Sequence, residues 1–349
     1  MAPLEWGLGH ATRCIPIICE LLHQNCEVFI AAEGATYFLL KEEFPQLTFL
    51  PLIGYRVKYS RRKCFLPLKI LMQFPKIIFT IYKEHQWLNR IIKRYKIDAI
   101  ISDNRFGLYS KKIPSVYITH QLLIKTGNGF TEKFAQKIHH HFIKKYNQCW
   151  VPDFENDGFA GELSHPKKLP GNVQYLGILS RFKLKEQTEK KYDLLISISG
   201  PEPQRTIFEE KILNELKSYT GKVLFIRGLP ENPASLRGTE LVEIKNHLTA
   251  KQFNEKILQS DIILSRCGYT TIMDLIKLKK KAIIIPTPGQ TEQEYLAKYL
   301  MKKKIFYIVK QKDFSLQKDI QQAASMLFNI PDYDMLQYKK IISQFVQSL

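Results

Sequence analysis

The segment 261–297 constrains the fold of this chain most, because it contains two successive strand-to-helix connections. A short apolar, β-favouring run, 261–265, leads through Gly268 into a predicted helix that opens at the two following threonines. The apolar run 282–286 is followed by a loop rich in proline and glycine and by a second helix from about Glu292. The pattern predicts neighbouring parallel strands whose loops lie side by side at one edge of a sheet.

This edge is suited to a sugar phosphate. Helix N-termini offer free N–H groups and the positive end of the macrodipole to a phosphate. Thr270 and Thr271 can hold an oxygen, and Asp274 can accept hydrogen bonds from a pair of sugar hydroxyls. Three side chains of the second loop suit a neutral polyol: Gln290, Glu292 and Gln293. Taken alone, the first loop is explained equally well as a turn followed by a helix cap.

Together, SRCGYTTIMDL and PTPGQTEQEYLA resemble the donor-binding half of GT-B glycosyltransferases, and within these the family 28 type N-acetylglucosaminyltransferases that make the lipid-linked peptidoglycan intermediate. The resemblance implies an α/β fold of two doubly wound Rossmann-like domains that face each other across a cleft. It also implies a nucleotide-sugar donor, a UDP-sugar by this likeness, which is a substrate, so no cofactor is expected.

The length of 349 residues, 45% of them hydrophobic, suits two ordinary cores. We expect an N-terminal acceptor-binding domain over 1–178 and a C-terminal donor-binding domain over 179–332. The segment 333–349 has the apolar spacing of an amphipathic helix, which in GT-B enzymes packs back on the first domain.

The net charge of +19 is concentrated in residues 51–150, which hold 20 Lys and Arg against 4 Asp and Glu. Such a surface attracts nucleic acid, anionic lipid or a phosphorylated substrate. RNA-recognition and helix-turn-helix signatures are absent, which disfavours nucleic acid. The apolar stretch Cys64–Tyr82 is interrupted by Lys69, Pro75 and Lys76, so it is a poor spanning helix that could still lie on a membrane. Pro75 is expected to divide the segment 66–95 into two helices.

Six cysteines without a CxxC pair are typical of reduced thiols in a cytosolic protein. The first residues lack the apolar core of a secretory signal. They look like the tail of a strand whose beginning is absent. We therefore expect a cytoplasmic protein, held peripherally at the inner face of the plasma membrane.

The run WGLGHATR lies between this first strand and a helix predicted over 11–23. It lacks the third glycine of a dinucleotide fingerprint, which argues against NAD or FAD. It resembles the first loop of GT-B enzymes, and the likeness implies that Gly7 and Gly9 face the acceptor. His10 titrates near neutral pH and is the candidate base, although a helix-capping histidine explains it too.

Two further buried strands are predicted over 97–102 and 116–119, and polar residues follow both. Asp103 is the alternative base. By resemblance Arg105, His120 and Gln121 face the acceptor. The purely structural alternatives are a surface ion pair between Asp103 and Arg105 and, for His120, a loop histidine that is hydrogen-bonded within the protein. The three histidines 139–141 cannot converge on one metal from a single helix and are expected to face solvent.

The second domain opens with an apolar strand over 192–198 and a loop in which prolines remove two amide donors. By resemblance the donor contacts are Arg181, Ser199, Gly200, Arg227, Leu248, Arg266, Gly268, Thr270, Thr271, Asp274, Gln290, Glu292 and Gln293. Arg181 is equally well explained as a linker charge. The sequence shows no Asp-x-Asp pair suited to a divalent ion, so no metal site is expected.

These observations favour a glycosyltransferase that moves a hexose or N-acetylhexosamine to an acceptor hydroxyl with inversion, on a glycan or lipid-linked acceptor of the cell envelope. A nucleotide-sugar epimerase of the same fold is the alternative. A basic nucleic-acid-binding protein is the alternative of a different class.

Overall fold

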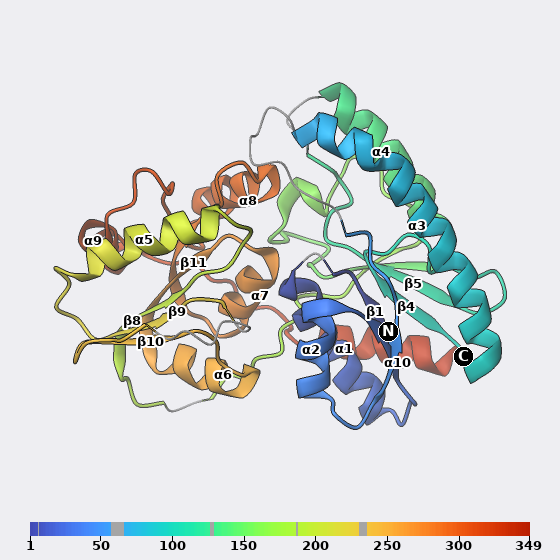
Figure 1. The fold of residues 1–349 in the computed structure, drawn as a ribbon, viewed down its shortest axis with the longest axis horizontal. Coiled ribbons are helices and arrows are strands. Elements are labelled where there is room, and N and C mark those ends of the chain that lie inside the picture. The colour runs from blue at the N-terminus through green and yellow to red at the C-terminus, as the bar shows by residue number, and fades with distance from the viewer. Residues whose placement is uncertain (6, 57–65, 126–128, 186–187, 230–235) are drawn as a thin grey trace. The chain divides into compact units, whose positions relative to one another are not determined.

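The computed structural model describes residues 1–5, 7–56, 66–125, 129–185, 188–229 and 236–349. It divides into an N-terminal unit, Met1–Ser180 with Asp334–Leu349, and a C-terminal unit, Arg181–Tyr333 (Figure 1). The division thus falls after Ser180 and before Asp334, whereas the sequence analysis placed it after residue 178 and before residue 333. Trp6 and Cys64, which belong to two of the segments discussed above, lie outside the described residues.

The N-terminal unit is built on a parallel sheet in the order β1-β4-β5-β6-β7. Its strands are β1 (Ala2–Pro3), β4 (Ile100–Asp103), β5 (Ser115–Ile118), β6 (Gln148–Val151) and β7 (Val173–Tyr175). β2 (Phe29–Ala32) and β3 (Thr48–Pro51) form a parallel pair. The amino group of Met1 donates to Phe29 O (2.8 Å) and Ala31 N donates to Met1 O (2.9 Å), so this pair continues the sheet beside β1. β7 was missed by the sequence analysis, because it is only three residues long.

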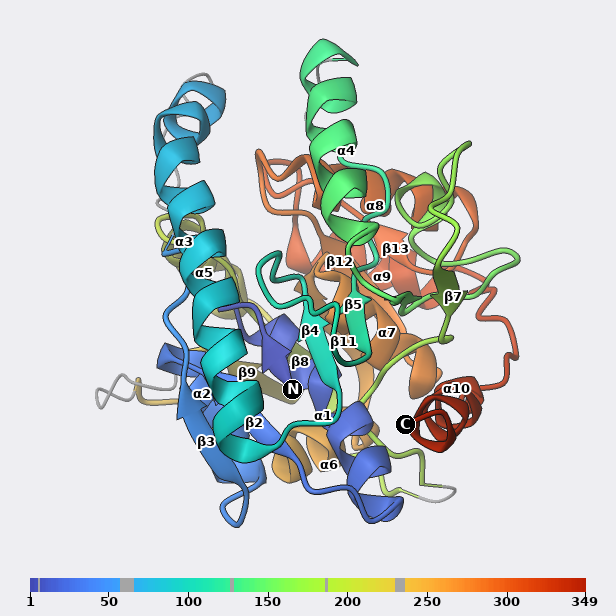
Figure 2. The same ribbon diagram turned by 90° about the vertical axis from the view of Figure 1, so that its right-hand side faces the viewer.

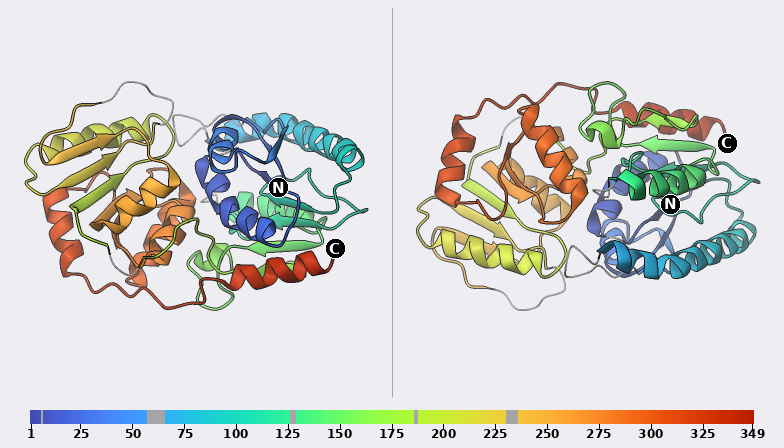
Figure 3. Two further views of the ribbon diagram at one scale, coloured as in Figure 1. Left: turned by 90° about the horizontal axis from the view of Figure 1, so that it is seen from below. Right: turned by 90° about the horizontal axis from the view of Figure 1, so that it is seen from above.

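Helices cover both faces of this sheet, which is why β4 and β5 are buried at every position. They are α1 (Leu8–His23), α2 (Gly34–Glu43), α3 (Leu66–Tyr95), α4 (Gly129–Ile143) and α10 (Gln337–Gln347), with a 3-10 turn at Gly161–Leu163. α10, drawn in red, lies against the N-terminal unit (Figure 3). Gln337 Nε2 donates to Tyr175 O (2.9 Å), and Phe345 packs edge-on against Trp150, so the last segment of the chain is part of this unit.

α3 runs without a break through Pro75, so the expectation of two helices was wrong. Proline leaves one backbone carbonyl without its helical partner, and Pro75 is exposed, where water can meet that carbonyl. Further along, Ile81 and Leu88 are buried. This packing holds the helix despite the lost bond.

The histidines of α4 do not form a solvent-facing row as expected. His139 is 4% exposed, because its helical position places it on the same face as the buried Phe142 and Ile143. Its Nε2 lies 3.3 Å from the hydroxyl of Tyr117, and burial lowers its pKa to about 3. His139 is therefore a neutral core residue.

The C-terminal unit has a six-stranded parallel sheet in the order β10-β9-β8-β11-β12-β13. The strands are β8 (Tyr192–Ser197), β9 (Val223–Ile226), β10 (Val242–Lys245), β11 (Ser260–Arg266), β12 (Lys281–Ile285) and β13 (Tyr307–Ile308). The helices are α5 (Gln204–Leu216), α6 (Ala250–Leu258), α7 (Tyr269–Lys277), α8 (Thr291–Lys302) and α9 (Leu316–Ser325). α5 and α9 cover one face and α6 and α7 the other (Figure 1).

Strand order reverses once in each unit. The chain passes from β1 to β2 and β3 on one side and then returns to β4 on the other. In the same way β8 is followed by β9 and β10, and the chain returns to β11 on the opposite side. Ligands of doubly wound sheets bind at such reversals, at the carboxyl ends of the strands. The loops that follow β1 and β4, and those that follow β8 and β11, are therefore the places to look for a site.

Among the described residues, no helix is long and apolar enough to cross a bilayer. The five cysteines that the structure describes are all free thiols.

Candidate functional site

The first candidate centre lies where α1 begins, beside the end of β4. α1 starts at Leu8, three residues earlier than expected, after Gly7 with a φ of 103° that favours glycine. His10 therefore lies in the first turn of the helix. Residues three apart share one face of a helix, so Arg13 lies next to His10. The sequence analysis missed Arg13 because it began the helix at 11.

Four polar side chains converge here. Arg13 donates through Nε to Asp103 Oδ2 (2.9 Å) and through Nη2 to Asp103 Oδ1. The same guanidinium reaches Nδ1 of His10 through Nη2 (2.9 Å) and Nδ1 of His120 through Nη1 (3.1 Å). His10 Nδ1 also lies 3.2 Å from Asp103 Oδ2. The structure thus brings together His10, Asp103 and His120, three of the residues singled out in the sequence.

The charges of this cluster determine its protonation. Burial disfavours a charged Asp103, but the guanidinium of Arg13 and the imidazole of His10 outweigh it and lower the pKa of the carboxyl to about 2. Burial, followed by the nearby Arg13, lowers the pKa of His10 from its usual 6.5. The side chain of His10 is 16% exposed and that of Asp103 is fully buried. At neutral pH the cluster presents an uncharged imidazole, backed by a carboxylate, to the surroundings.

Arg105 does not line this centre, which corrects its expected acceptor role. Its side chain is fully buried and donates to Glu84 Oε1 (2.8 Å) and to Ile53 O (2.7 Å). Glu84 also accepts from Tyr55 OH (2.9 Å). Arg105, two residues after β4, therefore joins the strand end to α3, and Asp103 and Arg105 are both buried and form no ion pair at the surface. Gln121 is half-buried, directly after His120.

A second buried carboxylate, which the sequence analysis missed, organises the loop after β6. Asp153 accepts from Phe159 N (2.7 Å), Ala160 N (3.0 Å), Phe154 N (3.0 Å) and Ser164 Oγ (2.6 Å). The only signal in the sequence was its place just after a buried strand. Leu163 O then accepts from Leu123 N (2.8 Å), so this loop supports the segment that carries His120.

The second candidate centre is the turn between β11 and α7. Gly268 caps α7 without a side-chain hydrogen bond, and Thr270 and Thr271 lie half-buried in its first turn. Asp274, one turn further, is 8% exposed. A small cavity of about 40 Å³ opens here on the α6–α7 face of the sheet. Five polar residues line it: Ser197, Ser199, Ser265, Thr271 and Asp274. A cavity of this size is too small for a whole nucleotide-sugar, so it accepts only part of a polar ligand.

Arg266 ends β11 on the opposite face and is 2% exposed. Its guanidinium lies 4.2 Å over the ring of Phe208, and Nη2 donates to Gln204 O (2.9 Å). Nε and Nη1 have no partner among the described residues, and neither has the hydroxyl of Thr287. Burial lowers the pKa of Arg266 to about 10. Unsatisfied buried donors are rare and indicate a missing partner, either water or ligand.

The loop after β12 is held by its own side chains. Gln293 accepts from Thr287 N through Oε1 (2.8 Å) and donates to Oε1 of Gln290 through Nε2. Glu294, which the sequence analysis overlooked, accepts from Gly289 N (2.9 Å). Glu292 lies half-buried in the first turn of α8. The two predicted glutamines thus shape this loop together.

The loop after β8 offers less to a phosphate than the family pattern implies. Ser199 and Gly200 are exposed. At the start of α5, however, Glu202 accepts from Thr206 N (3.2 Å) and from Arg205 Nε (2.5 Å). A carboxylate at a helix N-terminus stabilises the helix but repels another anion.

Arg227 also differs from its expected donor role. Its Nε donates to Glu209 Oε1 (2.7 Å) and its Nη1 to Asn246 Oδ1 (3.0 Å), so its guanidinium braces the loops after β9 and β10. Arg181 is half-buried, with its guanidinium 5.1 Å over the ring of Phe182. Leu248 is half-buried beside the capping box of Thr249.

Gly228 joins the loops after β8 and β9. Its φ is +70°, and a Cβ on it would lie 2.3 Å from the carbonyl oxygen of Ile198. Only glycine permits this approach without displacing one of the loops. The position of Ser199 therefore depends on Gly228.

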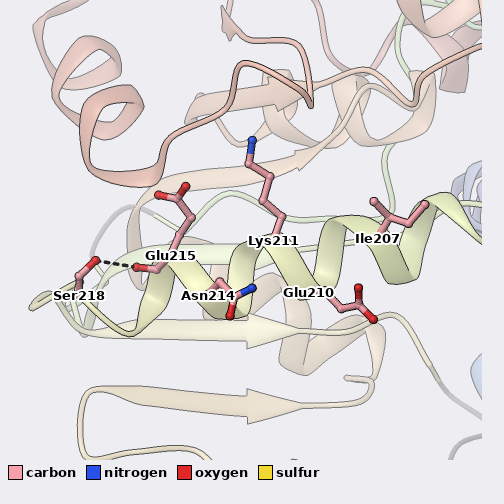
Figure 4. A pocket seen from close by; sticks show the side chains of 6 residues that line it. All are labelled: Ile207, Glu210, Lys211, Asn214, Glu215 and Ser218. Carbon is pink, nitrogen blue, oxygen red and sulfur yellow. Dashed lines mark hydrogen bonds between the residues drawn. The ribbon is translucent and has the colours of Figure 1, made fainter.

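A hollow on α5 carries no site (Figure 4). Its lining residues come from this helix and the turn after it: Ile207, Glu210, Lys211, Asn214, Glu215 and Ser218. Lys211 donates to Gln311 O (3.1 Å), and Glu215 accepts from Leu316 N (2.9 Å). These polar groups fasten α5 to the segment before α9 and do not converge on a ligand.

Known proteins resemble this chain in sequence and in fold. Residues 206–346 match the model of the glycosyltransferase family 28 C-terminal domain. The chain is 24% identical over 344 residues to the UDP-N-acetylglucosamine–N-acetylmuramyl-(pentapeptide) pyrophosphoryl-undecaprenol N-acetylglucosamine transferase of Desulforamulus reducens, covering 92% of this chain and 88% of that protein. It is 22% identical over 316 residues to an "uncharacterized glycosyltransferase" of Methanosarcina acetivorans, covering 82% and 79%.

Solved structures show the same architecture. The glycotransferase of kitacinnamycin superposes with a TM-score of 0.65 at 12% identity, covering 100% of this chain and 94% of that one. At this identity the likeness concerns the fold alone.

Proposed function

Since residues 206–346 match the family 28 domain and the whole chain shares its fold with GT-B transferases, the chain is a glycosyltransferase of GT-B type, and we propose that it moves a hexose or N-acetylhexosamine from a UDP-sugar to an acceptor hydroxyl with inversion. The observation that supports this most is the turn 266–271. It lies at the strand-order reversal of the C-terminal unit, caps α7 with a glycine and stands one helical turn from the buried Asp274.

On the donor side, the N-terminal N–H groups of α7 and the helix macrodipole stabilise the leaving diphosphate. Asp274 accepts from the ribose hydroxyls. Gln290, Glu292 and Gln293 face the hexose, and Ser199, Gly200, Thr270 and Thr271 face the phosphates, with Arg181, Arg266 and the Leu248 backbone completing the set. Arg105 and Arg227 are left out, because their guanidinium groups are bound to Glu84 and to Glu209.

On the acceptor side, Nδ1 of His10 carries the ring proton and donates it to Asp103 Oδ2, so that the unprotonated Nε2 removes the proton of the attacking hydroxyl. The hydroxyl oxygen forms the new bond to the anomeric carbon as the bond to the diphosphate oxygen breaks. Asp103 stabilises the imidazolium that results, because its carboxylate lies 3.2 Å from Nδ1. Gly7, Gly9, His120 and Gln121 line the acceptor's approach.

We predict that Asp274→Ala weakens UDP binding roughly 10- to 100-fold, since hydrogen bonds to a charged group contribute about 1.5–3 kcal/mol. Thermal shift against UDP, GDP, TDP and their sugars measures this effect, because a ligand stabilises the folded state by mass action. The matched control is Asp313→Ala, an exposed carboxylate of the same unit, which should keep the shift. An unchanged UDP shift in Asp274→Ala would place the ribose elsewhere.

Product analysis then tests the reaction itself. Sugar transfer from the UDP-sugar to an added acceptor supports the proposal. Conversion of the UDP-sugar without acceptor would instead identify an epimerase, and salt-sensitive RNA binding without nucleotide-sugar affinity would identify a nucleic-acid-binding protein.

The acceptor's setting is proposed from the surfaces of α3 and α4. Both helices project in the same direction from the N-terminal unit (Figure 2). Large apolar side chains are exposed on them, with exposures of 43% to 60%: Ile78, Phe79, Tyr82 and Phe134. Exposed lysines interleave with these: Lys76, Lys83, Lys133 and Lys137. We call these eight residues the α3–α4 patch. It suits an anionic bilayer at the cytoplasmic face, and hence a lipid-linked or cell-envelope acceptor.

Flotation with vesicles tests this location. We predict that the chain floats with phosphatidylserine-containing vesicles and less with neutral ones, and that Lys83→Gln with Lys137→Gln lowers binding about 25-fold, at about 1 kcal/mol per lysine. Phe79→Ser should weaken binding too, whereas the same change at Phe38, an exposed phenylalanine on α2, should not. Equal binding to neutral and anionic vesicles would remove the basis of the membrane proposal.

A further inference from the structure

Arg13 holds the His10 centre together. It is 2% exposed and comes from the same helix as His10. Its planar fork binds both oxygens of Asp103, and its Nη2 and Nη1 lie 2.9 Å from Nδ1 of His10 and 3.1 Å from Nδ1 of His120. Bidentate binding of a carboxylate fixes orientation as well as distance.

This geometry leaves one ring nitrogen of His10 for a substrate. Nδ1 lies 2.9 Å from Arg13 Nη2 and 3.2 Å from Asp103 Oδ2, so it is enclosed by the cluster. The side chain of His10 is nevertheless 16% exposed, while those of Arg13 and Asp103 are 2% and 0% exposed. Only the imidazole edge that carries Nε2 can therefore reach outward.

We propose that Arg13 is a positioning residue of the transfer reaction: its guanidinium fixes Asp103, whose Oδ2 accepts the Nδ1 proton of His10, so that the unprotonated Nε2 of His10 meets the acceptor hydroxyl. This inference rests on the proposed function. Arg13 itself touches no reacting atom.

The charge of Arg13 gives this role a signature that a purely structural residue would lack. The titratable groups that face His10 are Arg13 from its own helix, Asp103 from β4 and His120 from the segment after β5. The thiol of Cys14, 3.7 Å from Asp103 Oδ2, completes the surroundings. The positive charge of Arg13 opposes a proton on His10, and the negative charge of Asp103 favours it. Removing the guanidinium takes away the larger of the two charges that oppose the proton and leaves the carboxylate, with His120 as the smaller opposing group, so His10 should titrate at a higher pH.

The test compares Arg13→Gln and Arg13→Lys in the full chain. Glutamine removes both the bidentate guanidinium and its charge. We expect kcat to fall about 100-fold, the usual cost of a misplaced catalytic group, while the KM for the UDP-sugar stays unchanged. The acid limb of the pH–rate profile should move to higher pH. Lysine restores the charge but not the fork. It should return the acid limb to its original position while kcat stays low.

An NMR titration of the His10 ring needs no turnover and separates the two hypotheses. A higher titration midpoint in Arg13→Gln, reversed in Arg13→Lys, supports the positioning role even if no acceptor has been found. If the wild-type chain transfers no sugar while this midpoint moves, the proposed function alone fails. An unmoved midpoint and acid limb, with kcat falling only as the folded fraction falls, would show that Arg13 is merely structural. If Arg13→Gln does not fold, the kcat and KM values of Arg13→Lys decide.

Discussion

Replacing His10 by alanine is expected to lower kcat by about 10²–10⁴-fold, the usual contribution of a general base. The imidazole is the exposed member of its cluster, whereas the carboxylate behind it is fully buried and cannot reach a substrate. Donor affinity should be unchanged, because the UDP-sugar is assigned to the other unit. Initial rates over a range of both substrates measure the separate effects on kcat and KM.

The pH–rate profile of the wild-type chain supplies a second check on His10. A base acts in its unprotonated form, so activity falls as the pH drops through the pKa of His10. Burial and the charge of Arg13 lower this pKa from 6.5, so the acid limb should lie below pH 6.5. His23→Ala is the matched control, since this histidine ends the same helix and its side chain is 83% exposed. An active His10→Ala variant with the wild-type profile would assign the base to another residue.

The second large effect is expected from Asp153→Ala, which should destabilise the chain by about 3–5 kcal/mol. The substitution leaves three backbone N–H groups and the hydroxyl of Ser164 without their acceptor in a fully buried place. Gly158 packs directly on the carboxylate, so water has little room to replace it. Such a loss is a large part of the stability of an ordinary domain.

Thermal unfolding measures the effect of Asp153→Ala, and a fall of roughly 10 °C in Tm is expected for a unit of this size. Glu155→Ala is the control, because Glu155 is exposed two residues further along the same loop. Indistinguishable melting of the two variants would contradict the structural role of Asp153. Because the loop supports the His120 segment, the folded fraction of Asp153→Ala should also show weakened acceptor binding.

The spacing of apolar residues and the residues typical of turns predicted more of the C-terminal unit than of the N-terminal unit. Gly268, the threonine pair and Asp274 were found from the alternation of apolar runs with glycine turns, and they lie where α7 begins. The strand predicted over 261–265 is observed as β11, Ser260–Arg266, which is one residue longer at each end. The GT-B fold follows from two such halves and is confirmed by the solved structures.

The side-chain partners could not be predicted in this way. Arg105 and Arg227 both follow buried strands, and position alone makes such residues candidates for a site. Each was instead bound by a glutamate of a helix that packs on the same sheet, Glu84 and Glu209. Pairing across elements is a tertiary property, and the helical period of one segment does not reveal it. Arg13 was missed because the predicted helix began three residues too late. With the helix starting at 11, His10 was outside it, and the two residues could not be recognised as neighbours on one helix face.

Gly228 has a consequence for the descent of this chain. A methyl group at this position would collide with the carbonyl oxygen of Ile198. A relative in which the loops after β8 and β9 approach each other as closely must therefore keep glycine here. A relative with any larger residue has had to rebuild the strand end that carries Ser199. This one position therefore separates relatives that keep the present arrangement of the loops after β8 and β9 from relatives that have rebuilt it.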